Sequence, residues 1–79
     1  MFHANDKIIQ DEYSYVIKNI DGIQERIKTC KKRIAHMRTI RNQLLVIGDI
    51  DTARSMTHEI HDLLCRLLVM QKIIKAPTN

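Results

Sequence analysis

Two runs of apolar residues with the same heptad spacing, separated by Gly48, constrain this chain more than any other feature of its sequence. In both runs, apolar side chains recur at alternating steps of four and three residues, the pattern of helices that pack lengthwise against each other. The first run comprises Ile9, Tyr13, Val16, Ile20, Ile23, Ile27, Cys30, Ile34, Met37 and Leu44, with a single interruption at Arg41. The second run comprises Ala53, Met56, Ile60, Leu63, Leu67, Met70 and Ile74. The spacing predicts two long helices.

The boundaries of these helices follow from residues that commonly begin or end a helix. Asn5 or Asp6 is suited to cap a first helix over about residues 6–47, and Gly48 is suited to end it. The sequence Asp21-Gly22-Ile23-Gln24 also has the form of a helix start, so a break near residues 21–22 is an alternative to one continuous helix. A turn at residues 48–49 and a second helix over about residues 50–75 complete the prediction.

Folding the chain at Gly48 brings the two apolar runs into phase over seven layers, which predicts an all-α fold. We expect one domain over residues 1–79, an antiparallel helical hairpin with heptad, coiled-coil-like packing. Its predicted core consists of Ile23, Ile27, Cys30, Ile34, Met37, Leu44, Ala53, Met56, Ile60, Leu63, Leu67, Met70 and Ile74.

Composition narrows the class of protein further. The chain has 79 residues, a net charge of +4, two cysteines, no signal peptide and no apolar run long enough to cross a bilayer. These features predict a soluble protein of the reducing cytoplasm. Neither a Gly-rich phosphate loop nor a nucleophile motif is present, so we expect no enzyme activity and no cofactor.

The stretch Thr57-His58-Glu59-Ile60-His61-Asp62-Leu63-Leu64-Cys65 is rich in potential metal ligands. With Ile60 and Leu63 facing the core, however, its histidines, Asp62 and Cys65 are predicted to point outward. No other His or Cys in the sequence is obviously brought near to complete a closed ligand shell. We therefore predict a solvated helix face with no metal, and no disulfide between Cys65 and the buried Cys30.

Residues 26–41 contain seven Lys or Arg and no Asp or Glu. One interpretation is partial neutralisation by acidic residues of the second helix, with Arg41 and Glu59 as the expected pair. The alternative is a homodimeric four-helix bundle that binds nucleic acid, similar in plan to plasmid copy-number RNA-binding hairpins. Its candidate contact residues are Lys28, Lys31, Lys32, Arg33 and Arg38.

The second helix carries more apolar residues than one partner helix can cover. Leu64, Leu68, Val69 and Ile73 lie outside the seam and are the predicted partner-binding residues. Three arrangements would cover them: residues 6–20 folded back on the second helix, a second copy of the chain, or a different protein.

The chain resembles the small co-chaperones of the type III secretion needle subunit. The resemblance covers about residues 20–75 and lies in the length, the turn Val46-Ile47-Gly48-Asp49-Ile50-Asp51 and the aliphatic helix from Leu63 to Ile74. It implies a cytoplasmic hairpin that binds a helical-repeat chaperone and helps to keep the needle subunit unpolymerised. It would make the surface around Leu64, Leu68 and Ile73 the chaperone-binding site.

Overall fold

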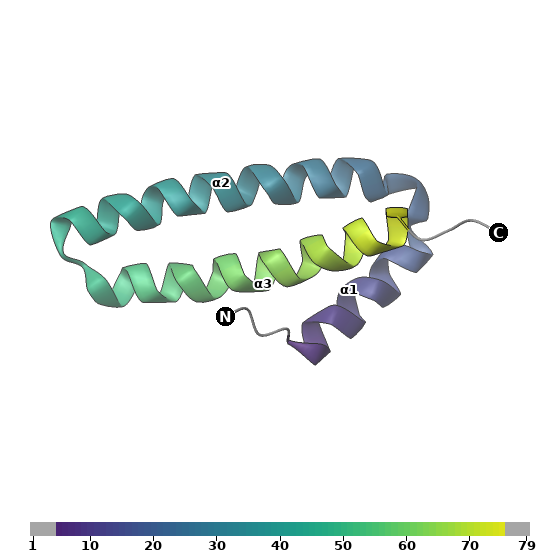
Figure 1. Ribbon diagram of the computed structural model, residues 1–79, viewed down its shortest axis with the longest axis horizontal. Coiled ribbons are helices and arrows are strands. Elements are labelled where there is room, and N and C mark those ends of the chain that lie inside the picture. The colour runs from purple at the N-terminus through teal and green to yellow at the C-terminus, as the bar shows by residue number, and fades with distance from the viewer. Residues whose placement is uncertain (1–4, 76–79) are drawn as a thin grey trace.

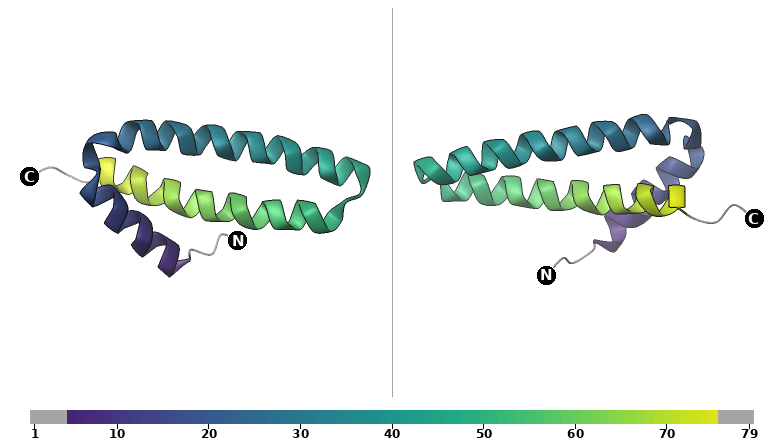
Figure 2. Two further views of the ribbon diagram at one scale, coloured as in Figure 1. Left: turned by 180° about the vertical axis from the view of Figure 1, so that it is seen from behind. Right: turned by 45° about the horizontal axis from the view of Figure 1, so that its top comes forward.

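The computed structural model describes residues 5–75, which form a helical hairpin with a third, shorter helix packed against one arm. Helix α2 (Ile23–Ile47) and helix α3 (Ile50–Lys75) run antiparallel along the long axis of the molecule. Helix α1 (Asp6–Lys18) lies across the C-terminal half of α3 and runs in the same direction as α3 (Figures 1 and 2). The prediction of an all-α fold is confirmed. The ends of the predicted domain, residues 1–4 and 76–79, lie outside the described residues.

The first predicted helix is not continuous, so the expectation of one helix over residues 6–47 was wrong. Asn5 caps α1, since its side-chain oxygen accepts hydrogen bonds from the amides of Lys7 and Ile8. The helix ends at Asn19, whose φ of −128° leaves the helical region, and the 3₁₀ turn η1 (Ile20–Gly22) leads into α2. The break lies where the alternative helix start was predicted, although no side chain caps α2 there.

Gly48 makes the turn between α2 and α3. It has a φ of +85°, which a residue without a side chain adopts at little cost. The amide of Asp49 donates to the carbonyl of Leu44 and that of Gly48 to Leu45, the paired bonds that commonly end a helix before glycine. The carboxylate of Asp49 then accepts a bond from the amide of Thr52 at the start of α3.

The core lies between α2 and α3 and follows the first apolar run closely. Its buried residues on α2 are Ile23, Ile27, Cys30, Ile34 and Met37, and those of α3 include Ile60 and Met70. Ala53 is also buried, whereas Leu44, Met56, Leu63 and Leu67 are partly buried. Ile74 was wrongly assigned to the core: it is 41% exposed, because it lies at the end of α3 where the packed layers stop.

Helix α1 adds a second packed interface, on the side of α3 that faces away from α2. Val16 joins the core cluster at 1% exposure, while Ile8 and Ile9 are half-buried. Cys65 was predicted to point outward, but it is fully buried, because its side of α3 faces α1. Tyr13 and Ile20 of the predicted seam are exposed, because the break at residues 19–22 takes both out of line with the core-facing side of α2.

The charged interruption of the first run lies at the distal half of the hairpin. Arg41 is half-buried, and its Nε atom is shielded from solvent with no hydrogen-bond partner. The predicted ion pair between Arg41 and Glu59 does not form among the described residues.

None of the helices within residues 5–75 combines the length and the hydrophobicity that a membrane-spanning helix needs.

Candidate functional site

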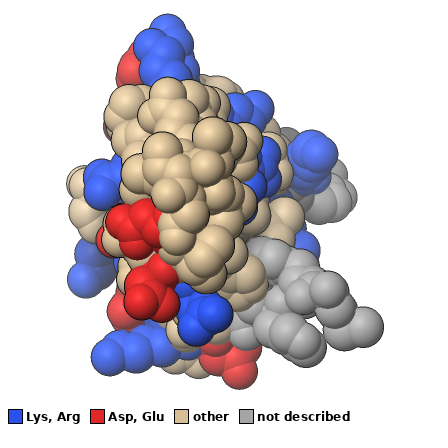
Figure 3. Space-filling view, turned by 90° about the vertical axis from the view of Figure 1, so that its left-hand side faces the viewer, with Lys and Arg blue, Asp and Glu red and all other residues tan. Residues whose placement is uncertain are grey.

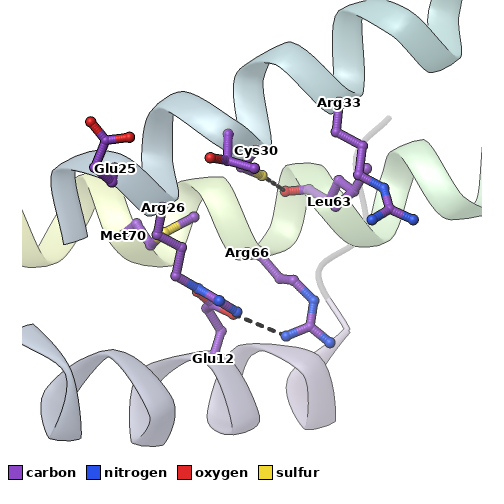
Figure 4. Close-up of a pocket in the computed structure, with 9 residues that line it drawn as sticks. Glu12, Glu25, Arg26, Cys30, Arg33, Leu63, Arg66 and Met70 are labelled. Atoms are coloured by element: carbon purple, nitrogen blue, oxygen red, sulfur yellow. Dashed lines mark hydrogen bonds and ion pairs between the residues drawn. The ribbon is translucent and has the colours of Figure 1, made fainter. Parts of the chain in front are cut away.

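The most completely buried charged group is Glu12, on the face of α1 that packs against the hairpin. Its side chain has no exposed surface, and two arginines from different helices bind it (Figure 4). Arg26 of α2 donates from Nε to Oε2 at 2.6 Å and from Nη2 to Oε1 at 2.8 Å. Arg66 of α3 donates from Nη1 to Oε1 at 2.9 Å. The carboxylate therefore joins all three long helices.

The electrostatics of this triad favour the charged forms of Glu12 and Arg26. Burial raises the pKa of Glu12, but the hydrogen bonds and charges of Arg26 and Arg66 together outweigh it and lower the pKa below 4.5. Glu12 in turn raises the pKa of Arg26. The guanidinium of Arg26 also lies 4.1 Å from the ring centroid of Tyr15, a cation–π distance. The arrangement is a three-helix clamp, which holds α1 in place.

A cavity of about 420 Å³ opens beside the clamp, between α2 and α3 on the side of α1. Its apolar lining residues are Cys30, Leu63 and Met70, of which Leu63 is half-buried and Met70 has no exposed surface. The thiol of Cys30 donates to the carbonyl of Leu63 at 3.4 Å. Burial, followed by the charge of Glu12, raises the pKa of the Cys30 thiol. Three arginines, Arg26, Arg33 and Arg66, line the same cavity together with Glu12, Glu25 and Thr29.

The five basic residues predicted for a nucleic-acid surface are all exposed, yet they do not form one face of α2. At about 100° per residue, Arg33 and Arg38 lie about 140° apart around the helix. Arg33 is on the flank that lines the cavity, with Arg26 and Thr29. Lys28 and Lys32 lie on the side opposite the core, and Lys31 and Arg38 on the other flank. The structure therefore separates Arg33 from the remaining predicted residues.

The residues predicted to bind a partner have unequal surroundings, because α1 covers part of their surface. Val69 is buried, whereas Leu64 and Ile73 are half-buried. Leu68 remains 46% exposed. Val69 and Ile73 line one wall of a groove of about 380 Å³ between α1 and α3, which Ile9, Tyr13, Ile17 and Lys72 complete. This set of six residues is called the α1/α3 groove below.

A second apolar surface lies at the turn of the hairpin, far from α1. Val46 is 86% exposed and Ile47 75% exposed, and Leu45 and Ile50 are about half exposed. Figure 3, which looks onto this end, shows uncharged side chains across its centre, with acidic side chains at one margin and basic side chains around it. Val46, Ile47 and Ile50 belong to the turn sequence that carries the family resemblance, and none of the four residues was predicted to form a surface.

The histidine-rich stretch of α3 lies along the middle of the helix. His58 is exposed, whereas His61 and Asp62 are half-buried, so the predicted fully solvated face was wrong in part. Cys30 and Cys65 are both free thiols. Within the described part of the chain, no group of three or more His, Cys, Asp or Glu side chains is arranged to hold a metal ion.

The clamp residues Glu12 and Arg66 were missed because the sequence analysis followed apolar spacing alone. A signal was nevertheless present. Glu12 shares its helix face with Ile8, Ile9 and Val16, and Arg66 interrupts the aliphatic stretch of α3. A lone carboxylate on one apolar face and a lone guanidinium on another indicate a buried pair, since such charges are rarely buried without a partner.

Comparison of this chain with models of protein families, with characterised proteins and with solved structures finds no match. The candidate sites of this chain are the cavity beside the clamp, the α1/α3 groove and the apolar end of the hairpin. The clamp itself joins the three helices.

Proposed function

We propose that this chain is a non-enzymatic protein-binding module, and that the α1/α3 groove together with Leu68 is its docking surface. The observation that carries the proposal is that Leu68 stays 46% exposed and the groove stays open although α1 has already folded onto α3. Leu68 lies one turn before Lys72, a lining residue, so it extends the groove along α3. Contiguous apolar surface of this kind marks interaction sites in small proteins.

The shape and charge of the groove favour an amphipathic helix as the partner. Its walls are two helices, and the aliphatic and aromatic side chains between them suit apolar anchors spaced three or four residues apart. Tyr13, 53% exposed, offers a large ring and a hydroxyl at the rim. Lys72, the one charged lining residue, would favour a partner helix with an acidic residue beside its apolar stripe.

A more specific form of the proposal follows from the resemblance to type III secretion co-chaperones. In this form, the partner is a helical-repeat chaperone, and the complex keeps a needle subunit unpolymerised in the cytoplasm. We also infer that α2 and α3 pack by heptad interdigitation. The buried residues of α2 repeat at steps of four and three, and on α3 the same spacing links buried Ala53, Ile60 and Met70 with partly buried Met56, Leu63 and Leu67. The chaperone partner and the heptad packing are both proposals that are added to the observed all-α hairpin.

The test compares two changes that each replace an exposed aliphatic residue with aspartate. Leu68→Asp alters the proposed docking surface, whereas Val46→Asp alters the hairpin end, where the side chain is 86% exposed. Tagged wild-type and variant chains would be recovered from the native cell, and the copurified proteins identified by mass spectrometry. Circular dichroism would verify that each variant is folded. We expect Leu68→Asp to lose the specific partner and Val46→Asp to keep it.

The opposite result would assign partner binding to the hairpin end and contradict the proposal. The nucleic-acid alternative has its own variant, in which Lys28, Lys31 and Lys32 are changed to Glu. If that variant alone loses its partner, and if binding of the wild type falls steeply with salt, the basic side of α2 is the functional surface. Retention of the partner by all three variants would contradict both functions.

A further inference from the structure

We propose that the cavity beside the clamp binds a carboxylate attached to an apolar body, with Arg33 and Arg66 contacting the carboxylate. This site is separate from the docking surface, because Arg66 and Leu68 point about 200° apart around α3. Figure 4 shows Arg33 descending from α2 and Arg66 extending from α3 on the same side of the cavity. Their guanidinium groups come from different helices and line one space.

Two arginines of the cavity have hydrogen-bond donors that no other described residue uses. Arg33 makes no hydrogen bond or ion pair with any other described residue, and Arg66 uses one N–H, on Glu12. Arg26 is committed to Glu12 through two nitrogens and stacks over Tyr15. Because a guanidinium has five N–H donors, Arg33 and Arg66 both retain donors that can bind a carboxylate.

The charged residues that line the cavity favour a negatively charged ligand. Three arginines line the cavity against two glutamates, and both oxygens of Glu12 already accept bonds from the clamp. Glu25 makes no ion pair within residues 5–75 and lies in the first turn of α2, two turns before Arg33. The part of the cavity near Arg33 and Arg66 is therefore positive, which favours an anion and disfavours a cation.

The apolar lining of the cavity favours a carboxylate over a phosphate. Leu63 and the edge of Cys30 form an apolar floor, which suits the hydrocarbon part of a ligand, and the Cys30 thiol already donates to the carbonyl of Leu63. A phosphate would have to give up water around several charged oxygens, whereas a carboxylate presents one planar edge to the two guanidiniums. A volume of about 420 Å³ is within the range of small-molecule sites.

The carboxylate has two possible sources: a free aliphatic acid or the C-terminus of a polypeptide. The probes are hexanoate for the first and N-acetyl-leucine for the second. Hexanol and N-acetyl-leucinamide are their uncharged controls, and inorganic phosphate tests the choice of anion. Each would be titrated into the isotope-labelled full-length chain, and NMR shifts of the arginine Nε–H groups, Cys30 and Leu63 would be followed.

We expect saturable binding of at least one carboxylate with a dissociation constant on the order of 1 mM, as befits so few ligand atoms. Arg33→Gln should weaken it about tenfold, the effect of losing one charge-assisted contact. Arg38→Gln, the matched control on the other flank of α2, should leave it unchanged. Neither residue belongs to the clamp, so both variants keep the fold. Tighter binding of hexanoate identifies a free acid, and tighter binding of N-acetyl-leucine identifies a polypeptide C-terminus.

Three results would overturn this inference. Equal binding of the uncharged controls would show that the carboxylate is not recognised. Tighter binding of phosphate than of either carboxylate would show that the apolar floor plays no part. Equal weakening by Arg33→Gln and Arg38→Gln would show that only the overall charge of α2 matters.

Discussion

The clamp predicts that Glu12→Gln will release α1 from the hairpin. The substitution keeps the shape of the side chain but removes the charge that receives three hydrogen bonds from Arg26 and Arg66. Breaking a fully buried ion pair costs about 3–5 kcal/mol. Here the two guanidiniums are about one-third exposed and can turn to water, which reduces the penalty. We expect α1 docking to weaken by about 2 kcal/mol, close to the value of one charge-assisted hydrogen bond.

Cys65 reports this release directly. Its side chain is fully buried on the side of α3 that faces α1, so a thiol reagent reaches it only when that interface opens. A loss of 2 kcal/mol corresponds to an increase of about 30-fold in the labelling rate of Cys65, measured by mass spectrometry. Glu25→Gln is the control, since Glu25 lines the same cavity and its side chain makes no hydrogen bond with another residue of the described range 5–75. If both variants label Cys65 at the wild-type rate, Glu12 does not hold α1 and the reasoning fails.

Three further predictions concern stability. The folded chain lowers the pKa of Glu12, so the ionised carboxylate adds to the free energy of unfolding above pH 4.5. This stabilisation is lost as the pH falls through the pKa of Glu12 in the folded chain. Urea unfolding followed by circular dichroism should therefore show a loss of stability in acid that Glu12→Gln lacks. Gly48→Ala should lower the free energy of unfolding by about 1–2 kcal/mol in the same assay, because the φ of Gly48 is +85°. Gly22→Ala should leave it about unchanged, because Gly22 has a negative φ and open space around it. Met70→Ala should lower the free energy of unfolding by about 2–5 kcal/mol, because Met70 is fully buried. Ile74→Ala should lower it by less than about 1 kcal/mol, because Ile74 is 41% exposed. Similar losses at both positions would contradict the described core.

The hairpin could be predicted from the sequence because two independent signals agree. The two apolar runs match in phase, and Gly48 lies where a left-handed residue is needed to end α2. The path of α1 could not be predicted in the same way. The heptad spacing continues through Ile20 and Ile23, which favours one long helix, while Asp21-Gly22 favours a break. Burial of Val16 and Glu12 against the hairpin favours the break, and this is a tertiary effect that local spacing does not contain.

The candidate sites were harder to predict for a related reason. Leu64, Leu68, Val69 and Ile73 were identified as surplus apolar residues, but their separate environments depend on where α1 packs. Arg33 was assigned to a basic stretch, because a linear count of charges does not distinguish the two flanks of α2. Only the packing of three helices shows that Arg33 shares a cavity with Arg66, which is 33 residues away in the sequence.

Helix α1 has two possible relations to the proposed docking surface: it covers that surface, or it forms part of it. A cover would place its own apolar residues over those of α3 and leave little open groove. Instead, Tyr13 and Ile17 of α1 are about half exposed and line the α1/α3 groove opposite Val69 and Ile73. The groove therefore exists only while α1 is docked. Because Glu12 holds α1 in place through Arg26 and Arg66, the buried clamp would keep the proposed docking surface formed without itself being part of that surface.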